Sequence, residues 1–431
     1  MRPGDAFGLW CLAFAASAVV GTHGLVYWDA GDYVRLAIEG GPSGLLLGRP
    51  LFLLVSRLIL ATGVEPASAE PVLRWFWAIV SATAAPALAW LALRLGLHRA
   101  ASLMAGAALA LSPSFAHMSQ HVLTVAPALA LSIVALIAAA SSRAVLAGVL
   151  LAAAITTRET AVVHAVAIAL LLGRRSAIAL SVAAMTIAAL IWIFPPPALM
   201  GWFQAMSRST AVQPVSWWEI VAPVIWLLAA GPVPVVVGIV ILMRRVSGPW
   251  RLVSVPAAIA TVVLLLYPDG SFSPRYLLAT APIAFFPAAA VWMAARPRVA
   301  IAAALLLPLA IVPVVAAPSR AVSARGAAVM HRIASLPAGT LLVPGHYCSY
   351  ARLGATILKR PDLELVCPGW DWPSDPARVL DAALASGRPV AIDLADDAWM
   401  PPREVANRDA VRAWAAGRPA RNLAGFTMIT K

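Results

Sequence analysis

Apolar runs separated by short arginine-containing segments dominate the first 317 residues of the chain. A helix needs about 20 apolar residues to cross a bilayer. The runs occupy residues 7–25, 75–93, 101–116, 122–141, 144–157, 160–173, 176–194, 220–243, 252–267, 277–295 and 299–317. This pattern predicts a polytopic α-helical membrane protein with about eleven transmembrane helices.

Two neighbouring runs, 144–157 and 160–173, are shorter than a straight span requires. The sequence TTRE, residues 156–159, lies between them. The pattern therefore predicts either tilted helices or a helix break at this tetrapeptide.

Arginine is distributed unevenly over the connections between the apolar runs. Alternate connections contain one acid, Asp5, and eleven arginines: Arg2, Arg94, Arg99, Arg143, Arg174, Arg175, Arg244, Arg245, Arg251, Arg296 and Arg298. Because cytoplasmic loops are enriched in Lys and Arg, this bias predicts a cytoplasmic N-terminus and, after an odd number of spans, an extracytoplasmic C-terminus. No convincing small-x-small cleavage site follows the first run, so we expect a retained helix rather than a signal peptide.

The composition supports the membrane class. The chain has 431 residues, of which 61% are hydrophobic and 12% charged, with a mean hydropathy of +0.84. Soluble domains carry about a quarter charged residues. The net charge of +13 is compatible with nucleic-acid binding, but the arginines sit in short clusters between apolar runs. That distribution indicates membrane topology and not a nucleic-acid partner.

Two of the predicted outer segments are long. Residues 26–74 contain apolar stretches at 34–38 and 50–60, which predict amphipathic helices along the outer membrane surface. Residues 195–219 begin with three prolines and contain Trp202, Trp217 and Trp218. Tryptophan at this level is typical of interfacial anchoring, which we favour over stacking on a substrate.

Residues 318–431 differ from the rest, because they contain ten of the 19 acidic residues. Strands are predicted at 340–343, 362–366, 389–394 and 426–430, and helices at 376–385 and 408–416. This alternation predicts a small α/β soluble domain. The predicted organisation is thus a transmembrane domain, 1–317, followed by an extracytoplasmic domain, 318–431. The latter has no Gly-rich phosphate loop, which argues against nucleotide binding.

Cysteines and histidines are few. Cys11 lies in the first span, while Cys348 and Cys367 lie in the domain predicted to face an oxidising compartment. These two predict either a disulfide or two free, buried thiols. His117 and His121 are four residues apart, which permits metal binding, but packing or hydrogen bonding is favoured. We predict no metal site.

Placing a carboxylate near a bilayer costs free energy, so such residues usually have a function. Eight lie on the predicted outer side of the first 317 residues: Asp29, Asp32, Glu39, Glu65, Glu70, Glu159, Glu219 and Asp269. Asp29 and Asp32 stand out because they directly follow the first span. They are candidates for a functional site, and the alternative is helix capping at the start of a helix over 33–38.

Four stretches resemble the GT-C superfamily of integral-membrane glycosyltransferases, which includes protein O-mannosyltransferases and aminoarabinose transferases. WDAGDYVRLA at 28–37 resembles the D-x-x-x-Y motif after the first helix, and GRPLF at 48–52 resembles the H/R-P-P-L-Y element. SPSF at 112–115 with VAP at 125–127 resembles an outer turn, and SPRYLL at 273–278 resembles the late R-Y-L-L-P segment. The resemblance covers roughly residues 1–317.

The resemblance implies an enzyme that takes a sugar from a polyprenyl phosphate and passes it, with inversion, to an acceptor hydroxyl at the outer face of the bacterial cytoplasmic (inner) membrane. The partners would be the lipid-linked donor, membrane lipid, and a glycan, lipid or protein acceptor. The enzyme would be a hexosyl- or pentosyltransferase for which no cofactor is indicated, with a divalent metal as the open alternative. A lipid-linked substrate transporter or flippase, and a non-catalytic scaffold, are the alternatives. We find no internal repeat of the kind many transporters have.

The resemblance also implies residue roles. Asp29 is the preferred base and Asp32 the second choice. Arg275 is the preferred ligand of the donor phosphate, since arginine binds phosphate with two parallel hydrogen bonds; its alternative is head-group contact. Further donor or substrate ligands are Tyr276, Arg158, Glu159, Tyr33, His121 and, more weakly, Arg49 and His23.

One position departs from the family. Many members have an acid two residues before the proline of the outer turn, where this chain has Val125. This weakens metal-dependent chemistry and leaves His121 or Gln120 as the nearest polar substitutes. Arg158 and Glu159 also predict an ion pair between two half-helices.

Overall fold

The computed structural model describes residues 1–20, 28–40, 49–192, 227, 232–243, 248–265, 277–296, 298, 317–345, 348–367, 375–393 and 402–431. The chain forms two compact units. Unit 1 comprises Met1–Gly21, Pro42–Thr62 and Pro71–Ser319, and unit 2 comprises Thr22–Gly41, Gly63–Glu70 and Arg320–Lys431. Unit 2 thus combines the C-terminal segment with two stretches that the sequence assigned to the transmembrane domain.

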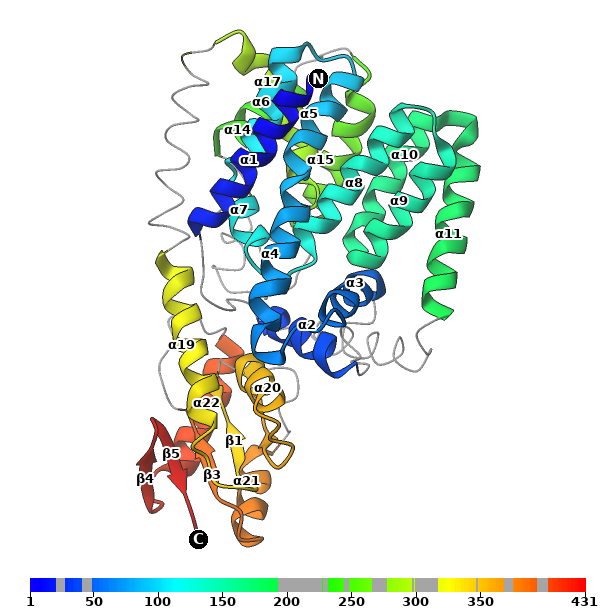
Figure 1. Cartoon of the computed structure of the whole chain (residues 1–431). Helices are drawn as coiled ribbons and strands as arrows, with labels where there is room; N and C mark the ends of the chain where they lie inside the picture. Colours follow the sequence, from blue (N-terminus) through cyan, green and yellow to red (C-terminus); the bar gives the residue numbers. More distant parts are fainter. Residues whose placement is uncertain are drawn as a thin grey trace. The chain divides into compact units, whose positions relative to one another are not determined.

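Unit 1 is helical. Its helices are α1 (Pro3–Val20), α3 (Pro50–Leu60), α4 (Ala69–Ala82), α5 (Ala84–Arg94), α6 (Arg99–Ala110), α7 (Pro113–Ser119), α8 (Val125–Ala140), α9 (Ala144–Thr157), α10 (His164–Leu172), α11 (Ser176–Trp192), α14 (Pro232–Met243), α15 (Arg251–Leu265) and α17 (Ala281–Ala294), with 3-10 turns η2 (Glu159–Val163) and η3 (Gly173–Arg175). The 3-10 turn η1 (Pro66–Ser68) belongs to unit 2. Helix α9 packs between α8 and α11, and α5 packs against α6 and α8 (Figure 1).

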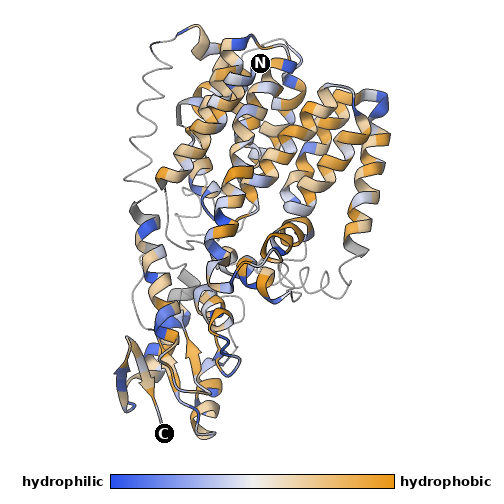
Figure 2. Cartoon of the chain, in the orientation of Figure 1, coloured by the Kyte–Doolittle hydropathy of each residue, from blue (hydrophilic) through white to orange (hydrophobic). Residues whose placement is uncertain are grey.

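In the described part of the chain, two continuous helical stretches, Pro66–Arg94 with 29 residues and Glu159–Leu190 with 32, are long and apolar enough to cross a membrane. Large apolar side chains on α9, α10 and α11 are exposed, including Val145, Val166 and Met185. The helices of unit 1 are hydrophobic along most of their length (Figure 2). Side chains of this kind suit lipid and not water. The mostly helical architecture with a small sheet is confirmed, whereas the number of spans stays a prediction.

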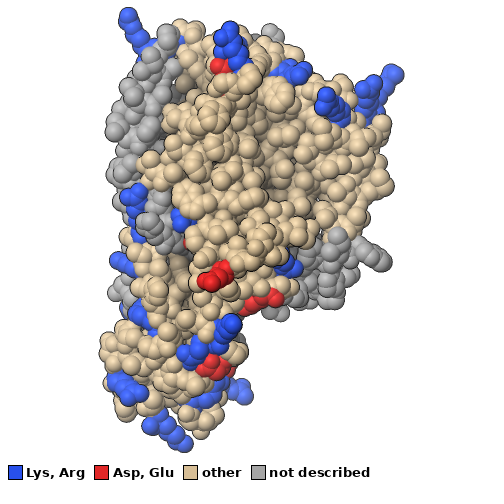
Figure 3. Space-filling model, viewed as in Figure 1, with Lys and Arg blue, Asp and Glu red and all other residues tan. Residues whose placement is uncertain are grey.

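Arginine-rich connections lie at one end of unit 1. Arg94 and Arg99 join α5 to α6, Arg143 precedes α9, and Arg174 and Arg175 lie between α10 and α11. Figure 3 shows Lys and Arg gathered at the end where the chain begins. This agrees with the alternation found in the sequence, and the side of the membrane remains a prediction.

Small residues allow the helices of unit 1 to approach closely. A Cβ on Gly106 of α6 would lie 2.7 Å from the carbonyl oxygen of Ala85 in α5. A Cβ on Gly148 of α9 would collide with the carbonyl of Ala179 in α11. Close backbone contact at glycine is typical of helix packing in membranes.

The expected break at residues 156–159 is confirmed. Helix α9 ends at Thr157, Arg158 is extended with φ −156° and ψ 125°, and η2 begins at Glu159. The single helix expected over 101–116 is wrong. Helix α6 ends at Ala110, and α7 starts anew at Pro113, capped by the Ser112 hydroxyl, which accepts a hydrogen bond of 3.3 Å from the Phe115 N–H. Proline at the first position favours a new helix start.

Unit 2 is built on a five-stranded sheet in the order β2-β1-β3-β5-β4. The strands are β1 (Leu341–Val343), β2 (Glu364–Leu365), β3 (Val390–Ile392), β4 (Ala420–Leu423) and β5 (Phe426–Ile429), and the helices are α2 (Trp28–Glu39), α19 (Ala317–Ile333), α20 (Cys348–Ile357), α21 (Pro376–Ala385) and α22 (Pro402–Ala415). Strand β1 pairs in parallel with β2 and β3, and β5 pairs antiparallel with β3 and β4.

The predicted strands correspond to β1, β2, β3 and β5, and the predicted helix at 376–385 is α21. Helix α22 begins at Pro402, six residues before the predicted start at 408. Strand β4 and helix α20 were not predicted. The stretches at 34–38 and 50–60 are helical, in α2 and α3.

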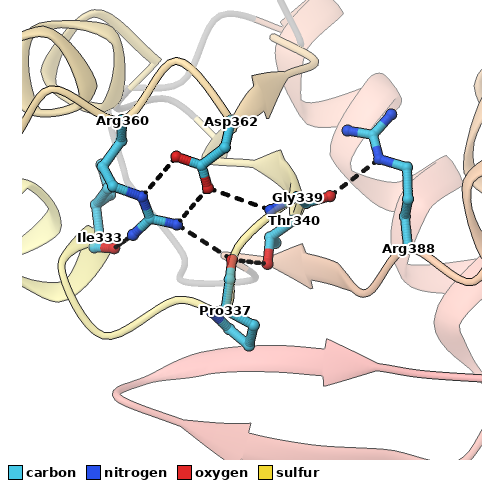
Figure 4. A network of polar contacts seen from close by, with 7 residues as sticks. All are labelled: Ile333, Pro337, Gly339, Thr340, Arg360, Asp362 and Arg388. Carbon is cyan, nitrogen blue, oxygen red and sulfur yellow. Dashed lines mark hydrogen bonds and ion pairs between the residues drawn. The ribbon is translucent and has the colours of Figure 1, made fainter.

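A network of polar contacts surrounds the segment that precedes β1 (Figure 4). Arg360 donates to both Asp362 oxygens, each at 2.8 Å, and Asp362 also accepts from the Gly339 N–H at 3.1 Å. These hydrogen bonds hold the pKa of Asp362 well below its usual range, with Arg360 as the main cause. The network joins the chain before β1 to the chain before β2.

Cys348 and Cys367 form a disulfide, so the alternative of two free thiols is wrong. Their Cα atoms are 5.6 Å apart. Cys348 is the first residue of α20, and Cys367 lies just after β2. The disulfide therefore fastens the start of α20 to the parallel edge of the sheet.

Candidate active site

Arg49 and Glu159 form an ion pair between segments that are 110 residues apart. Arg49 Nε and Nη2 each donate to a different oxygen of Glu159 at 3.3 Å. Arg49 immediately precedes α3, where Pro50 starts the helix, and Glu159 is the first residue of η2. The side chains are 8% and 32% exposed, respectively. The two parallel hydrogen bonds fix the orientation of the guanidinium group.

Arg158 lies next to this pair and is the largest fully buried side chain of the described residues, with 1% exposure. Its Nη1 donates to the Thr124 hydroxyl at 3.0 Å. The charges of both Arg49 and Arg158 act on the Glu159 carboxylate. The two hydrogen bonds to the carboxylate come from Arg49, and an ion pair between Arg158 and Glu159 stays a prediction.

These three residues constitute the Arg49–Glu159–Arg158 cluster. It contains two guanidinium groups and one carboxylate, so its own net charge is +1. Burying charge is expensive, and buried arginines in membrane proteins usually face an interior site where they serve function. Such a cluster is suited chemically to an anion such as a phosphate.

A second buried polar region consists of α7 and the residues on either side of it. Its buried polar residues are Ser112, Ser114, His117, Ser119, Gln120, His121 and Thr124. The rings of His117 and His121 meet edge to face with centroids 4.8 Å apart, and the charge of Arg74 acts on His121. Neither amide atom of Gln120 has a hydrogen-bond partner among the residues that the structure describes. A buried amide of this kind can bind a ligand hydroxyl.

His164 was not among the predicted site residues. It is 2% exposed, and its Nε2 lies 3.0 Å from the carbonyl oxygen of Ala279. The contact joins the start of α10 to the segment before α17. No local sequence signal marks this histidine, because its partner is 115 residues away.

Asp32 and Tyr33 lie in α2, in unit 2, and both are buried. Asp32 accepts a hydrogen bond from Arg35 Nε at 3.3 Å and lies 3.8 Å from Arg352 Nη1. The helix begins at Trp28, so the predicted capping of a helix starting at residue 33 is wrong. Asp29 is the second residue of α2, and its side chain lies outside the described part of the structure.

The sequence candidates thus fall into three groups. Arg49, Arg158 and Glu159 come together in unit 1, where His121 also lies. Asp29, Asp32 and Tyr33 share α2 in unit 2. Arg275, Tyr276 and His23 lie outside the described residues. The described part of the chain contains no group of three or more His, Cys, Asp or Glu side chains placed to hold a metal ion.

Comparisons with known proteins identify the fold. No family model and no curated protein matches the chain. The crystal structure of ArnT from Cupriavidus metallidurans bound to undecaprenyl phosphate matches 98% of this chain and 97% of its own, with 13% identity and a TM-score of 0.61.

Two structures from Archaeoglobus fulgidus are less similar. The oligosaccharyltransferase in its apo form has 12% identity and a TM-score of 0.47, with 83% of this chain and 64% of that chain covered. AglB in complex with an inhibitory peptide and a dolichol-phosphate has 12% identity and a TM-score of 0.49, with 90% and 69% covered. The assignment of the fold rests on ArnT alone, and this chain shares the fold of that structure over nearly its whole length.

Proposed function

We propose that the chain transfers a sugar from a polyprenyl-phosphate donor to an acceptor hydroxyl, with inversion, at the outer face of a bacterial cytoplasmic membrane. The observation that carries this proposal is the buried, net cationic Arg49–Glu159–Arg158 cluster. It occurs in a fold shared with ArnT, whose structure contains bound undecaprenyl phosphate. The acceptor is a glycan, a lipid or a protein, and the sugar is a hexose or pentose.

The cluster suits the leaving group. When the bond between the anomeric carbon and the phosphate oxygen breaks, negative charge develops on the lipid phosphate. Fixed cations in a site that excludes water stabilise such charge strongly. We assign Arg158 and Arg49 to this role, with Glu159 holding Arg49 in orientation, and Arg275 with Tyr276 as further ligands of the donor.

The carboxylates of α2 suit the acceptor. The acceptor oxygen attacks the anomeric carbon on the face opposite the phosphate, and its proton passes to Asp29 or Asp32. The new glycosidic bond forms as the bond to phosphate breaks, so the anomeric configuration inverts and no covalent enzyme intermediate arises. We assign Tyr33 and His121 as substrate contacts.

The base assignment is tested with the full chain reconstituted in lipid vesicles. Asp29→Asn and Asp32→Asn keep the size of the side chain and remove its basicity. Loss of a general base commonly lowers the rate about a hundred- to ten-thousandfold, and we expect this loss in at least one variant, at normal protein level. Glu65→Gln is the matched control, because Glu65 is an exposed carboxylate outside α2. Wild-type rates in both α2 variants would remove these residues from the mechanism.

A further inference from the structure

We propose that α20 belongs to the catalytic machinery, because it holds α2 in place, and that Arg352 is the positioning residue for Asp32. The inference rests on the proposed function, in which α2 carries the base. It assigns the C-terminal segment a role in building the site, beyond that of a domain appended after the last helix.

Gly31 marks where the two helices touch. A Cβ at this position would lie 2.9 Å from Ser349 Cβ and 3.0 Å from the Ser349 carbonyl oxygen. Real Cβ atoms do not approach other atoms so closely. Only glycine therefore fits where α2 meets the first turn of α20, one residue before Asp32.

Arg352 lies one turn further along α20. Its Nη1 is 3.8 Å from Asp32 Oδ2, while Arg35 of α2 donates to Asp32 Oδ1. The carboxylate is thus held between a cation of its own helix and a cation of α20. At 3.8 Å the contact between Arg352 Nη1 and Asp32 Oδ2 is an attraction between charges and longer than a hydrogen bond, so a lysine ammonium can supply it as well.

The contact continues to the far end of α2. Thr356 of α20 donates to Glu39 Oε1 at 2.5 Å. Ser349, Arg352 and Thr356 are spaced three and four residues apart and share one face of α20. Their partners on α2 follow in the same order, so the two helices run parallel, side by side.

The helix α20 is itself anchored. Its first residue, Cys348, is fastened by the disulfide to Cys367. Gly354 packs on α19, where a Cβ would lie 3.2 Å from Met330 Cα. A short helix such as α2 is marginal by itself, and it gains a fixed position from a neighbour that is tied to the sheet.

Hydrogen exchange of the α2 amides tests the docking independently of catalysis. Alanine favours helix more than glycine does, so Gly31→Ala would slow exchange in a helix that does not dock. We expect the opposite, with α2 amides exchanging about tenfold faster because the contact with Ser349 is lost. Gly8→Ala in α1 is the matched control, since no atom lies within 4 Å of its added Cβ. Equal or slower exchange in Gly31→Ala would overturn the proposal.

Kinetics of the full chain test the role of Arg352. We expect Arg352→Met to lower kcat about tenfold with the donor KM changed by less than about twofold, because a displaced base affects the chemical step. Arg352→Lys restores most of the rate. Wild-type kcat in Arg352→Met, or an equal loss in Arg352→Lys, would contradict the assignment. If the wild type itself transfers no sugar, the proposed function fails, while the exchange experiment still decides whether α20 holds α2.

Discussion

Glu159→Gln removes one negative charge from the Arg49–Glu159–Arg158 cluster and keeps the size of the side chain. The charges lie 3.3 Å apart, which corresponds to about 5 kcal/mol at an effective dielectric constant of about 20 and about 1.3 kcal/mol in water. Glu159 is 32% exposed, so solvent screens part of this attraction. We expect the free energy of unfolding to fall by about 1–3 kcal/mol.

Donor binding is expected to change in the opposite direction. The substitution raises the charge of the cluster from +1 to +2. A phosphate about 6 Å away, at an effective dielectric constant of about 40, gains roughly 1.4 kcal/mol, or about tenfold in affinity. Arg158→Met lowers the charge to zero and should weaken binding by a similar factor.

The assay is binding of polyprenyl phosphate to the protein in lipid nanodiscs, with thermal unfolding recorded on the same samples. Arg143→Met is the control, because Arg143 is exposed in the connection between α8 and α9. It removes a cation without touching the cluster, so affinity should stay the same. If Glu159→Gln and Arg158→Met both weaken binding, the cluster is structural and the phosphate role is refuted.

Three further predictions concern stability. Replacing Cys348 and Cys367 with serine should lower the free energy of unfolding of unit 2 by about 2–4 kcal/mol, because the disulfide closes a loop with a sequence separation of 19; an unchanged denaturant midpoint would contradict this. Gly148→Ala should destabilise unit 1 by about 1–3 kcal/mol through overpacking, whereas Gly4→Ala, with open space around it, should not alter thermal unfolding. The lowered pKa of Asp362 stabilises the fold above its unfolded pKa of about 3.9, and this contribution is lost as the pH falls through the folded value. The free energy of unfolding should therefore fall less steeply at acid pH in Asp362→Asn than in the wild type, and an unchanged slope would exclude the network as its cause.

Much of the secondary structure follows from the sequence. The apolar runs predict most helices of unit 1, and alternating segments predict four of the strands. Strand β4 is mostly exposed and polar, and it forms because the turn at Gly425 pairs it with β5. Helix α20 contains Gly354 and ends after ten residues. Its contacts with α2, α19 and the disulfide stabilise it, and none of these can be seen locally.

The site is less accessible to sequence reasoning. Arg49 is marked by its motif, and Glu159 by its position between two short runs. Their pairing over 110 residues has no local signal in the sequence. The sequence suggests Arg158 as the partner of Glu159, because the two residues are adjacent.

Release of free polyprenyl phosphate measures the proposed reaction most directly. The wild-type protein in vesicles would be incubated with a polyprenyl-phosphate sugar, with and without an acceptor extract, and both products followed by mass spectrometry. We predict release that requires both the protein and the extract, with the sugar appearing on an acceptor in equal amount. Movement of the intact donor lipid across the vesicle membrane, without any release of polyprenyl phosphate, would contradict a glycosyltransferase and indicate a flippase.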